Sequence, residues 1–298
     1  MCGIVGLFIK SDGLKSELGR LTNLMLLEMR DRGPDSSGFA IYDEPGTQNK
    51  LTCLSKSGQT QWNGVLKALS QETGQQHDIK VIDDHAILST DGDGPATRKW
   101  LIDNVPDITV LALGQSIELF KGIGDPESVS LRFGLTERSG THAIAHTRMA
   151  TESAVTTAGS HPFSTGADTC LVHNGSLSNH NRLRDMLRKR GETFQTDNDS
   201  EVAAGYFAWR MQEGDSLETA VDHALDDLDG FFTFAIGTKH GFAVVRDPIA
   251  CKPAVIAETD EWVAMSSEFR AIARLPGVEH AEIWEPEPTR VYSWSHVA

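Results

Sequence analysis

The amino-acid sequence predicts an α+β fold in which antiparallel sheets are covered by helices. Segments rich in β-branched and aromatic residues outnumber the helical segments. The expected strands also far outnumber the crossovers that a parallel sheet would need, and strands and helices occur in groups. The chain has 298 residues, of which 39% are hydrophobic, so it can bury a core large enough for one large domain or two small ones.

The first elements are a strand and a helix. The apolar run IVGLF at 4–8 follows Gly3 and precedes polar residues, which is typical of a buried strand. Gly33-Pro34 would end the helix that follows. The apolar residues expected on one face of that helix are Leu14, Leu18, Leu21, Met25 and Met29.

The remaining elements alternate between groups of strands and groups of helices. Strands are expected at 38–42, 51–56, 142–148, 168–175, 230–238, 242–247 and 261–267. Helices are expected at 180–191, 200–212 and 269–275. The stretch at about 62–135 has its own order of strand, helix, strand and strand, and we interpret it as an insertion.

Composition excludes several classes of protein. A net charge of −15 argues against a nucleic-acid partner, which would need a basic face. No apolar run is long enough to cross a membrane and no secretory signal is visible, so we expect a cytoplasmic protein. The four cysteines are scattered and are expected to be reduced. His142 and His146 would lie about 13 Å apart on one strand, so no metal site is expected.

Cys2 allows two interpretations. It can be the first residue of a buried strand, because free cysteine often behaves as a small hydrophobic residue. Alternatively, removal of Met1 would give one residue both a thiol and a free α-amine, and the amine could act as a base for the thiol.

Eight short motifs bear on this choice, and they occur in a fixed order. They are MCGIVG at 1–6, DRGPDSSG at 31–38, HTRMAT at 146–151, HP at 161–162, HNG at 173–175, TDNDSEV at 196–202, RDPIACKP at 246–253 and SSE at 266–268. Together they resemble the class II glutamine amidotransferases, which are N-terminal-nucleophile hydrolases. The resemblance implies a four-layer αββα sandwich and a single domain over 1–298, with the insertion at about 62–135. It also implies hydrolysis of L-glutamine through a cysteine thioester.

The resemblance assigns catalytic roles to three residues. Cys2 would be the nucleophile, and Asn174 and Gly175 would supply donors to the tetrahedral oxyanion. Considered alone, Asn174-Gly175 is also a strong signal for a hairpin turn.

Five further residues match positions that bind the substrate in this family. Arg148 and Thr151 would bind the α-carboxylate of glutamine, and Asp199 would bind its α-ammonium. Arg32 would shape a loop near the substrate, and His161 would lie beside the pocket. Taken singly, Arg148 could be a surface residue and Asp199 the N-cap of a helix.

Partner and cofactor expectations follow from the same resemblance. Family members usually fuse this domain to a synthase, whereas this chain ends at Ala298, so we expect the ammonia acceptor on another polypeptide. The 62–135 segment resembles stand-alone subunits of glutamate-synthase-like complexes. We therefore expect a hetero-oligomer whose partner subunits carry flavin (FMN) and an iron–sulfur cluster, with no cofactor in this chain. The alternatives are a subunit of N-methylglutamate synthase, in which the glutaminase pocket is auxiliary or inactive, and a non-enzymatic scaffold that keeps Cys2 as a core residue.

Overall fold

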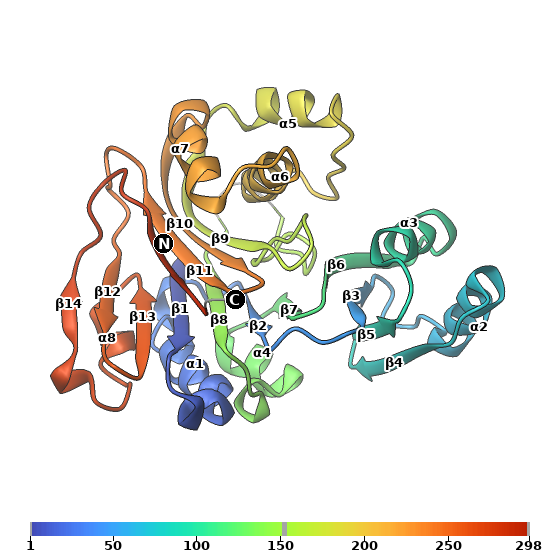
Figure 1. Cartoon of the computed structure of the whole chain (residues 1–298), viewed down its shortest axis with the longest axis horizontal. Helices are drawn as coiled ribbons and strands as arrows, with labels where there is room; N and C mark the ends of the chain where they lie inside the picture. The colour runs from blue at the N-terminus through green and yellow to red at the C-terminus, as the bar shows by residue number, and fades with distance from the viewer. Residues whose placement is uncertain (1, 151–153, 297–298) are drawn as a thin grey trace.

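The computed structural model describes residues 2–150 and 154–296, and its centre is a pair of packed sheets (Figure 1). The larger sheet has seven antiparallel strands in the order β14 (Glu282–Trp284), β12 (Val255–Glu258), β13 (Trp262–Ser266), β1 (Gly3–Ile9), β8 (His142–Arg148), β2 (Ser36–Tyr42) and β7 (Ile117–Ile123). The second sheet has four strands in the order β15 (Tyr292–Ser295), β11 (Gly241–Arg246), β10 (Gly230–Thr238) and β9 (Cys170–Leu177).

Helices cover the outer face of each sheet. The seven-stranded sheet packs against α1 (Leu18–Leu27), α4 (Pro126–Phe133) and α8 (Phe269–Ile272). The four-stranded sheet packs against α5 (His180–Arg188), α6 (Asp199–Gln212) and α7 (Leu217–Asp227), which form the upper layer in Figure 1. This arrangement confirms the αββα sandwich and the α+β class.

Strand β1 lies in the middle of the sandwich, and this position explains its apolar sequence. Val5 and Leu7 belong to the core under α1, whereas Ile4 and Phe8 belong to the core between the two sheets. A strand buried on both faces needs apolar residues at every position instead of an alternating pattern. The strand that follows Cys2 is therefore held rigidly from both sides.

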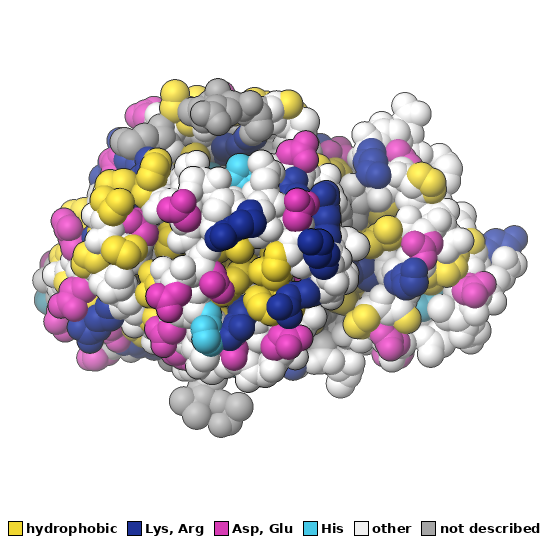
Figure 2. All heavy atoms as spheres, turned by 90° about the horizontal axis from the view of Figure 1, so that it is seen from above, with side chains coloured by type: hydrophobic (Ala, Val, Ile, Leu, Met, Phe, Trp, Pro, Cys, Tyr) yellow, Lys and Arg dark blue, Asp and Glu magenta, His cyan; other side chains and the backbone are white. Residues whose placement is uncertain are grey.

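A third sheet forms a separate lobe, at the right in Figure 1 and Figure 2. It consists of β4 (His77–Ile82), β5 (His85–Thr90), β3 (Asn49–Ser55) and β6 (Ile108–Gly114), with the helices α2 (Trp62–Thr73) and α3 (Gly94–Asn104). Its own core includes Leu51, Trp62, Leu88 and Leu101.

The bounds of this lobe differ from the insertion expected at about 62–135. The lobe begins earlier, with β3, and ends with β6. Strand β7 and helix α4 fall inside the expected range but belong to the sandwich, because β7 pairs with β2 along its whole length. The pairing of β7 with β2, which lies about 80 residues earlier, leaves no signal in the local sequence. The end of the lobe could therefore not be predicted from the sequence.

Several short elements were not expected from the sequence: α2, α4, α7, β4, β12, β14 and β15. Two of these helices carried recognisable start signals. Asp125 caps α4 by accepting a hydrogen bond from Glu127 N, with Pro126 next to it, and Ser216 caps α7 by accepting from Thr219 N. In the described part of the chain, no helix is both long and apolar enough to cross a membrane.

Candidate active site

Two of the expected site residues, Cys2 and Arg148, lie side by side where β1 begins and β8 ends. Gly3 pairs with Thr147 in the antiparallel ladder, so Cys2 leaves the sheet beside Arg148, the last residue of β8. Cys2 is half-buried and Arg148 is buried. The Arg148 guanidinium donates to Ala154 O at 3.4 Å, and Thr151 lies outside the described residues.

Arg32 contacts the backbone of Cys2 directly. Its side chain is 8% exposed, and Nε donates a hydrogen bond to the carbonyl oxygen of Cys2 at 2.9 Å. Its Nη1 donates to Glu268 Oε1 at 2.5 Å. Arg32 lies on a 3-10 turn, η2 (Arg30–Arg32). Its buried guanidinium therefore connects this turn with Cys2 and with Glu268, which follows β13.

Gly33 lets this turn lie directly on β8. A Cβ atom at this position would be 2.4 Å from Thr147 C and 2.5 Å from Arg148 N, both backbone atoms. Only a residue without a side chain permits this approach. The glycine of the DRGP motif therefore fixes Arg32 at the end of β8.

Asn174 and Gly175 lie within β9 and not in a hairpin turn. They pair with Thr233 and Phe232 of β10, so the expectation of a turn at this dipeptide is wrong. The Asn174 side chain is 3% exposed, and its Nδ2 is buried without a hydrogen-bond partner among the described residues. A buried unpaired donor is costly unless a ligand uses it. Gly175 has φ +156° and leaves no room for a Cβ, which would be 2.0 Å from Phe231 O.

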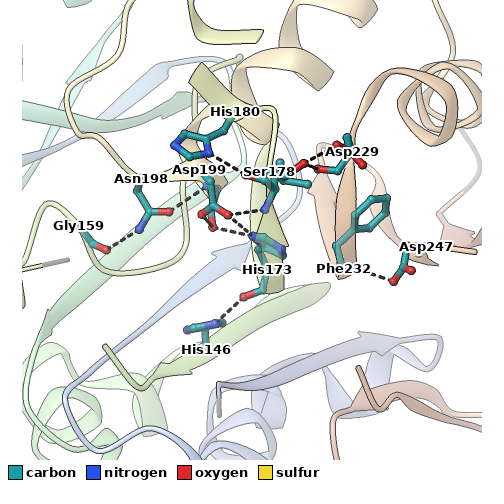
Figure 3. Close-up of polar contacts among 12 residues, drawn as sticks. His146, Gly159, His173, Ser178, His180, Asn198, Asp199, Asp229, Phe232 and Asp247 are labelled. Atoms are coloured by element: carbon teal, nitrogen blue, oxygen red, sulfur yellow. Dashed lines mark hydrogen bonds and ion pairs between the residues drawn. The ribbon is translucent and has the colours of Figure 1, made fainter. Parts of the chain in front are cut away.

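Asp199 is tied to the same strand (Figure 3). Its Oδ2 accepts a hydrogen bond from Leu177 N at 2.9 Å and lies 3.9 Å from His173 Nδ1. Asp199 is the first residue of α6, and the N-cap is its neighbour Asn198, which accepts from Ser200 N. The N-cap interpretation of Asp199 is therefore wrong by one residue, and its partly exposed carboxylate keeps capacity for another donor.

Three buried histidines support the junction of β8 and β9. His146 Nε2 lies 2.9 Å from the carbonyl oxygen of His173, a contact drawn in Figure 3, and the His146 ring stacks on His161 at 4.0 Å. Burial lowers the pKa of His146 to about 3 and lowers the pKa values of His161 and His173 as well. These imidazoles are therefore neutral. The expected contact of His161 with the substrate stays a prediction.

Lys121 is a buried residue of this region that the sequence interpretation missed. It lies on β7, and its Nζ donates hydrogen bonds to the carbonyl oxygens of Ala158, Ser160 and Pro162 at 2.8–3.1 Å. Burial lowers its pKa to about 7, and the ammonium lies 4.4 Å from the ring centre of Phe163. Lys121 thus holds the loop that carries His161. A lysine inside the apolar strand sequence IELFKGI was the available signal.

The fold and the site together define the class. Two sheets between helical layers, with a cysteine before the first central strand, are the architecture of class II glutamine amidotransferases. Two solved structures share it: glutamine phosphoribosylpyrophosphate amidotransferase from B. subtilis (TM-score 0.61) and an allosteric regulatory enzyme of purine biosynthesis (TM-score 0.65). Each is 20% identical, and the alignments cover 99% of this chain but 49% and 47% of those chains. The chain therefore spans about half their length, and the likeness concerns the fold alone.

Closer relatives give the family. The chain is 51% identical over 298 residues to the glutamine amidotransferase-like protein GlxB of Rhizobium meliloti, covering 99% of both. It is 33% identical over 304 residues to a protein of Methanothermobacter thermautotrophicus that is provisionally named a glutamine amidotransferase, covering 98% of this chain and 99% of the relative. Residues 146–274 match the glutamine amidotransferase domain model. The chain belongs to the glutamine amidotransferase family.

The described residues contain no group of three or more His, Cys, Asp or Glu side chains placed to hold a metal ion. His142 and His146 each contact a different backbone carbonyl oxygen, those of Thr238 and His173.

Proposed function

We propose that this chain hydrolyses L-glutamine to glutamate and ammonia, with Cys2 as the nucleophile. Two observations support the proposal. Cys2 lies beside Arg148 at the paired ends of β1 and β8, and β8 contacts β9 through His146 and the carbonyl oxygen of His173, the residue before Asn174. Asp199 accepts a hydrogen bond from Leu177 N of the same strand β9. The family motifs assign nucleophile, carboxylate binding, oxyanion binding and ammonium binding to Cys2, Arg148, Asn174 and Asp199, respectively.

The proposed reaction begins after removal of Met1. The free α-amine of Cys2 takes the thiol proton, and the sulfur attacks the side-chain carbonyl carbon of glutamine. The carbonyl oxygen becomes an oxyanion, to which Asn174 Nδ2 donates a hydrogen bond; this buried donor has no protein partner among the described residues. The C–N bond then breaks, and the amine returns its proton to the departing ammonia. Water hydrolyses the remaining thioester to glutamate and restores the thiol.

The test compares Cys2→Ala with Cys251→Ala in a glutamate-release assay. Cys251 is exposed and belongs to no part of the site, so its variant should keep full activity. Cys2→Ala should abolish activity while the protein stays folded. Intact mass of the wild-type protein establishes in the same experiment whether Met1 is absent. Glutamate release by Cys2→Ala would refute the assignment of Cys2 as the nucleophile. A folded and processed wild type without glutaminase activity would support the scaffold alternative instead.

We further propose that the ammonia passes to a glutamate-synthase-like partner subunit that carries FMN and an iron–sulfur cluster. The resemblance of the inserted segment to stand-alone subunits supports this proposal. A competing proposal is a subunit of N-methylglutamate synthase, in which the acceptor chemistry uses methylamine. Both predict co-purification with a flavin protein from the native host, followed by native mass spectrometry. The purified complex should use glutamine nitrogen in the first case, and free methylamine without glutamine hydrolysis in the second.

A further inference from the structure

A large cleft lies outside the glutamine site, between the third-sheet lobe and the sandwich. Its volume is about 1010 Å³, within the range of small-molecule sites. Its walls come from α3 and β6 on the lobe and from residues 165–167 and 191–195 on the sandwich. None of the residues assigned to glutamine hydrolysis lines it.

Arg98 of α3 is the main polar group of this cleft. Its Nη1 donates to Thr165 O at 2.9 Å, and it forms no ion pair with any carboxylate in the part of the chain that the structure describes. The Arg98 side chain is half-buried, and its burial lowers the pKa of the guanidinium. A desolvated cation normally has an anionic partner, because an uncompensated buried charge is costly. Arg98 is therefore a group suited to binding an anion.

The other charged groups of the cleft leave this requirement unmet. Lys99 is paired with Asp103, and Lys56 donates to the carbonyl oxygen of Pro106. Glu192 and Glu201 both attract Arg98, but only from beyond ion-pair distance. Glu201 lies outside the lining of the cleft and accepts hydrogen bonds from Gln195 and Thr196, and burial raises the pKa of the Glu192 carboxyl group. Three cations and two carboxylates line the cleft, in a chain whose net charge is −15.

The rest of the cleft is apolar. Its lining includes Pro95, Ile102, Leu113 and Phe194, and the Ile102 side chain is 46% exposed. A surface that combines apolar walls with one partly desolvated guanidinium suits a ligand with an apolar body and one anionic group.

We propose that this cleft binds a small organic anion, a carboxylate or phosphate on an apolar body, through Arg98 and the apolar wall around Ile102. The site is separate from the glutamine site and does not depend on the proposed hydrolysis. Its ligand lies between the lobe and the sandwich and contacts both.

The test uses 8-anilinonaphthalene-1-sulfonate, a fluorescent anion with an apolar body, on the folded full-length protein. Wild type should bind the dye at one site. Arg98→Gln should weaken binding by about tenfold or more, through loss of a charge-assisted contact. Ile102→Glu should weaken it similarly without disturbing the core. The matched control is Val81→Glu, which also changes an exposed apolar residue of the lobe (49% exposed) but lies outside the cleft.

Two competitions complete the experiment. N-phenyl-1-naphthylamine, which lacks the sulfonate, should bind wild type at least about tenfold more weakly than the anionic dye. Benzoate or phenyl phosphate should displace the dye, and the more effective of the two identifies the anionic group. The proposal is overturned if wild type binds no dye, if Arg98→Gln and Ile102→Glu bind it like wild type, if Val81→Glu weakens it equally, or if neither anion displaces it.

Discussion

Replacing Arg32 with methionine should lower kcat for glutamine hydrolysis and leave KM nearly unchanged. Methionine keeps an unbranched apolar chain of similar reach in the buried part of the site, but it cannot donate to the carbonyl oxygen of Cys2. Cys2 would then lose the hydrogen bond that fixes its backbone beside Arg148. The nucleophile would sample more positions, and fewer of them would lie within reach of the substrate.

The expected size follows from the contact that is lost. A hydrogen bond from a charged donor contributes about 1.5–3 kcal/mol, and each 1.36 kcal/mol of barrier is tenfold in rate. If most of this energy positions Cys2, kcat should fall by about 10- to 150-fold. Glu268→Gln removes only the charge from the second partner of Arg32 and should have a smaller effect.

Steady-state glutamate release over a range of glutamine concentrations separates the two roles that Arg32 could have. Arg274→Met is the control, because Arg274 is an exposed arginine that pairs with Glu28 and has no hydrogen bond to Cys2 among the described residues. A raised KM with unchanged kcat would refute the positioning argument. It would indicate that Arg32 Nη2, which lacks a partner among the described residues, binds the substrate.

Three further outcomes are expected. Asn174→Ala should lower kcat by about 10²–10³-fold with little change in KM, as loss of one oxyanion donor does, and a change in KM alone would contradict this role. Gly33→Ala should destabilise the fold by about 1–3 kcal/mol in urea unfolding, because its Cβ would meet the β8 backbone, whereas Gly64→Ala in α2 should not. Acid should destabilise the protein: burial lowers the pKa values of His142 and His146 to about 3, so below pH 6.5 the unfolded chain binds protons that the folded chain does not. Each of these two should cost about 2.7 kcal/mol at pH 4.5, so an equal urea midpoint at pH 7 and pH 4.5 would refute the argument.

Sequence patterns predicted the long central strands of the sandwich, because these strands are apolar on both faces or bounded by turn residues. They could not predict sheet order, since β1 pairs with residues about 140 and 260 positions away. For the same reason they could not assign β7 to the sandwich or find the edge strands β14 and β15, which are short and partly exposed.

The site shows the same division. The motif residues Asn174, Gly175 and Asp199 could be singled out because the motifs occur in a fixed order. The residues that hold the site in place could not be predicted, because they act through contacts between segments that are distant in sequence. Lys121 contacts a loop about 40 residues later, and Glu268 contacts Arg32 across 236 positions. No local pattern marks such partners, although a lysine within an apolar strand is a warning that something buried compensates its charge.

The order of strands around β1 also constrains how the protein is made. The neighbours of β1 are β8, which ends at residue 148, and β13, which ends at residue 266. At a synthesis rate of about 5–20 residues per second, the second neighbour emerges roughly 13–50 s after β1. During that interval this strongly apolar segment has an unpaired edge, and the residues before it are open to processing enzymes. The same central position that later immobilises Cys2 therefore gives the chain a long period in which Met1 is accessible for removal, and in which the unpaired edge of β1 is able to pair with other chains.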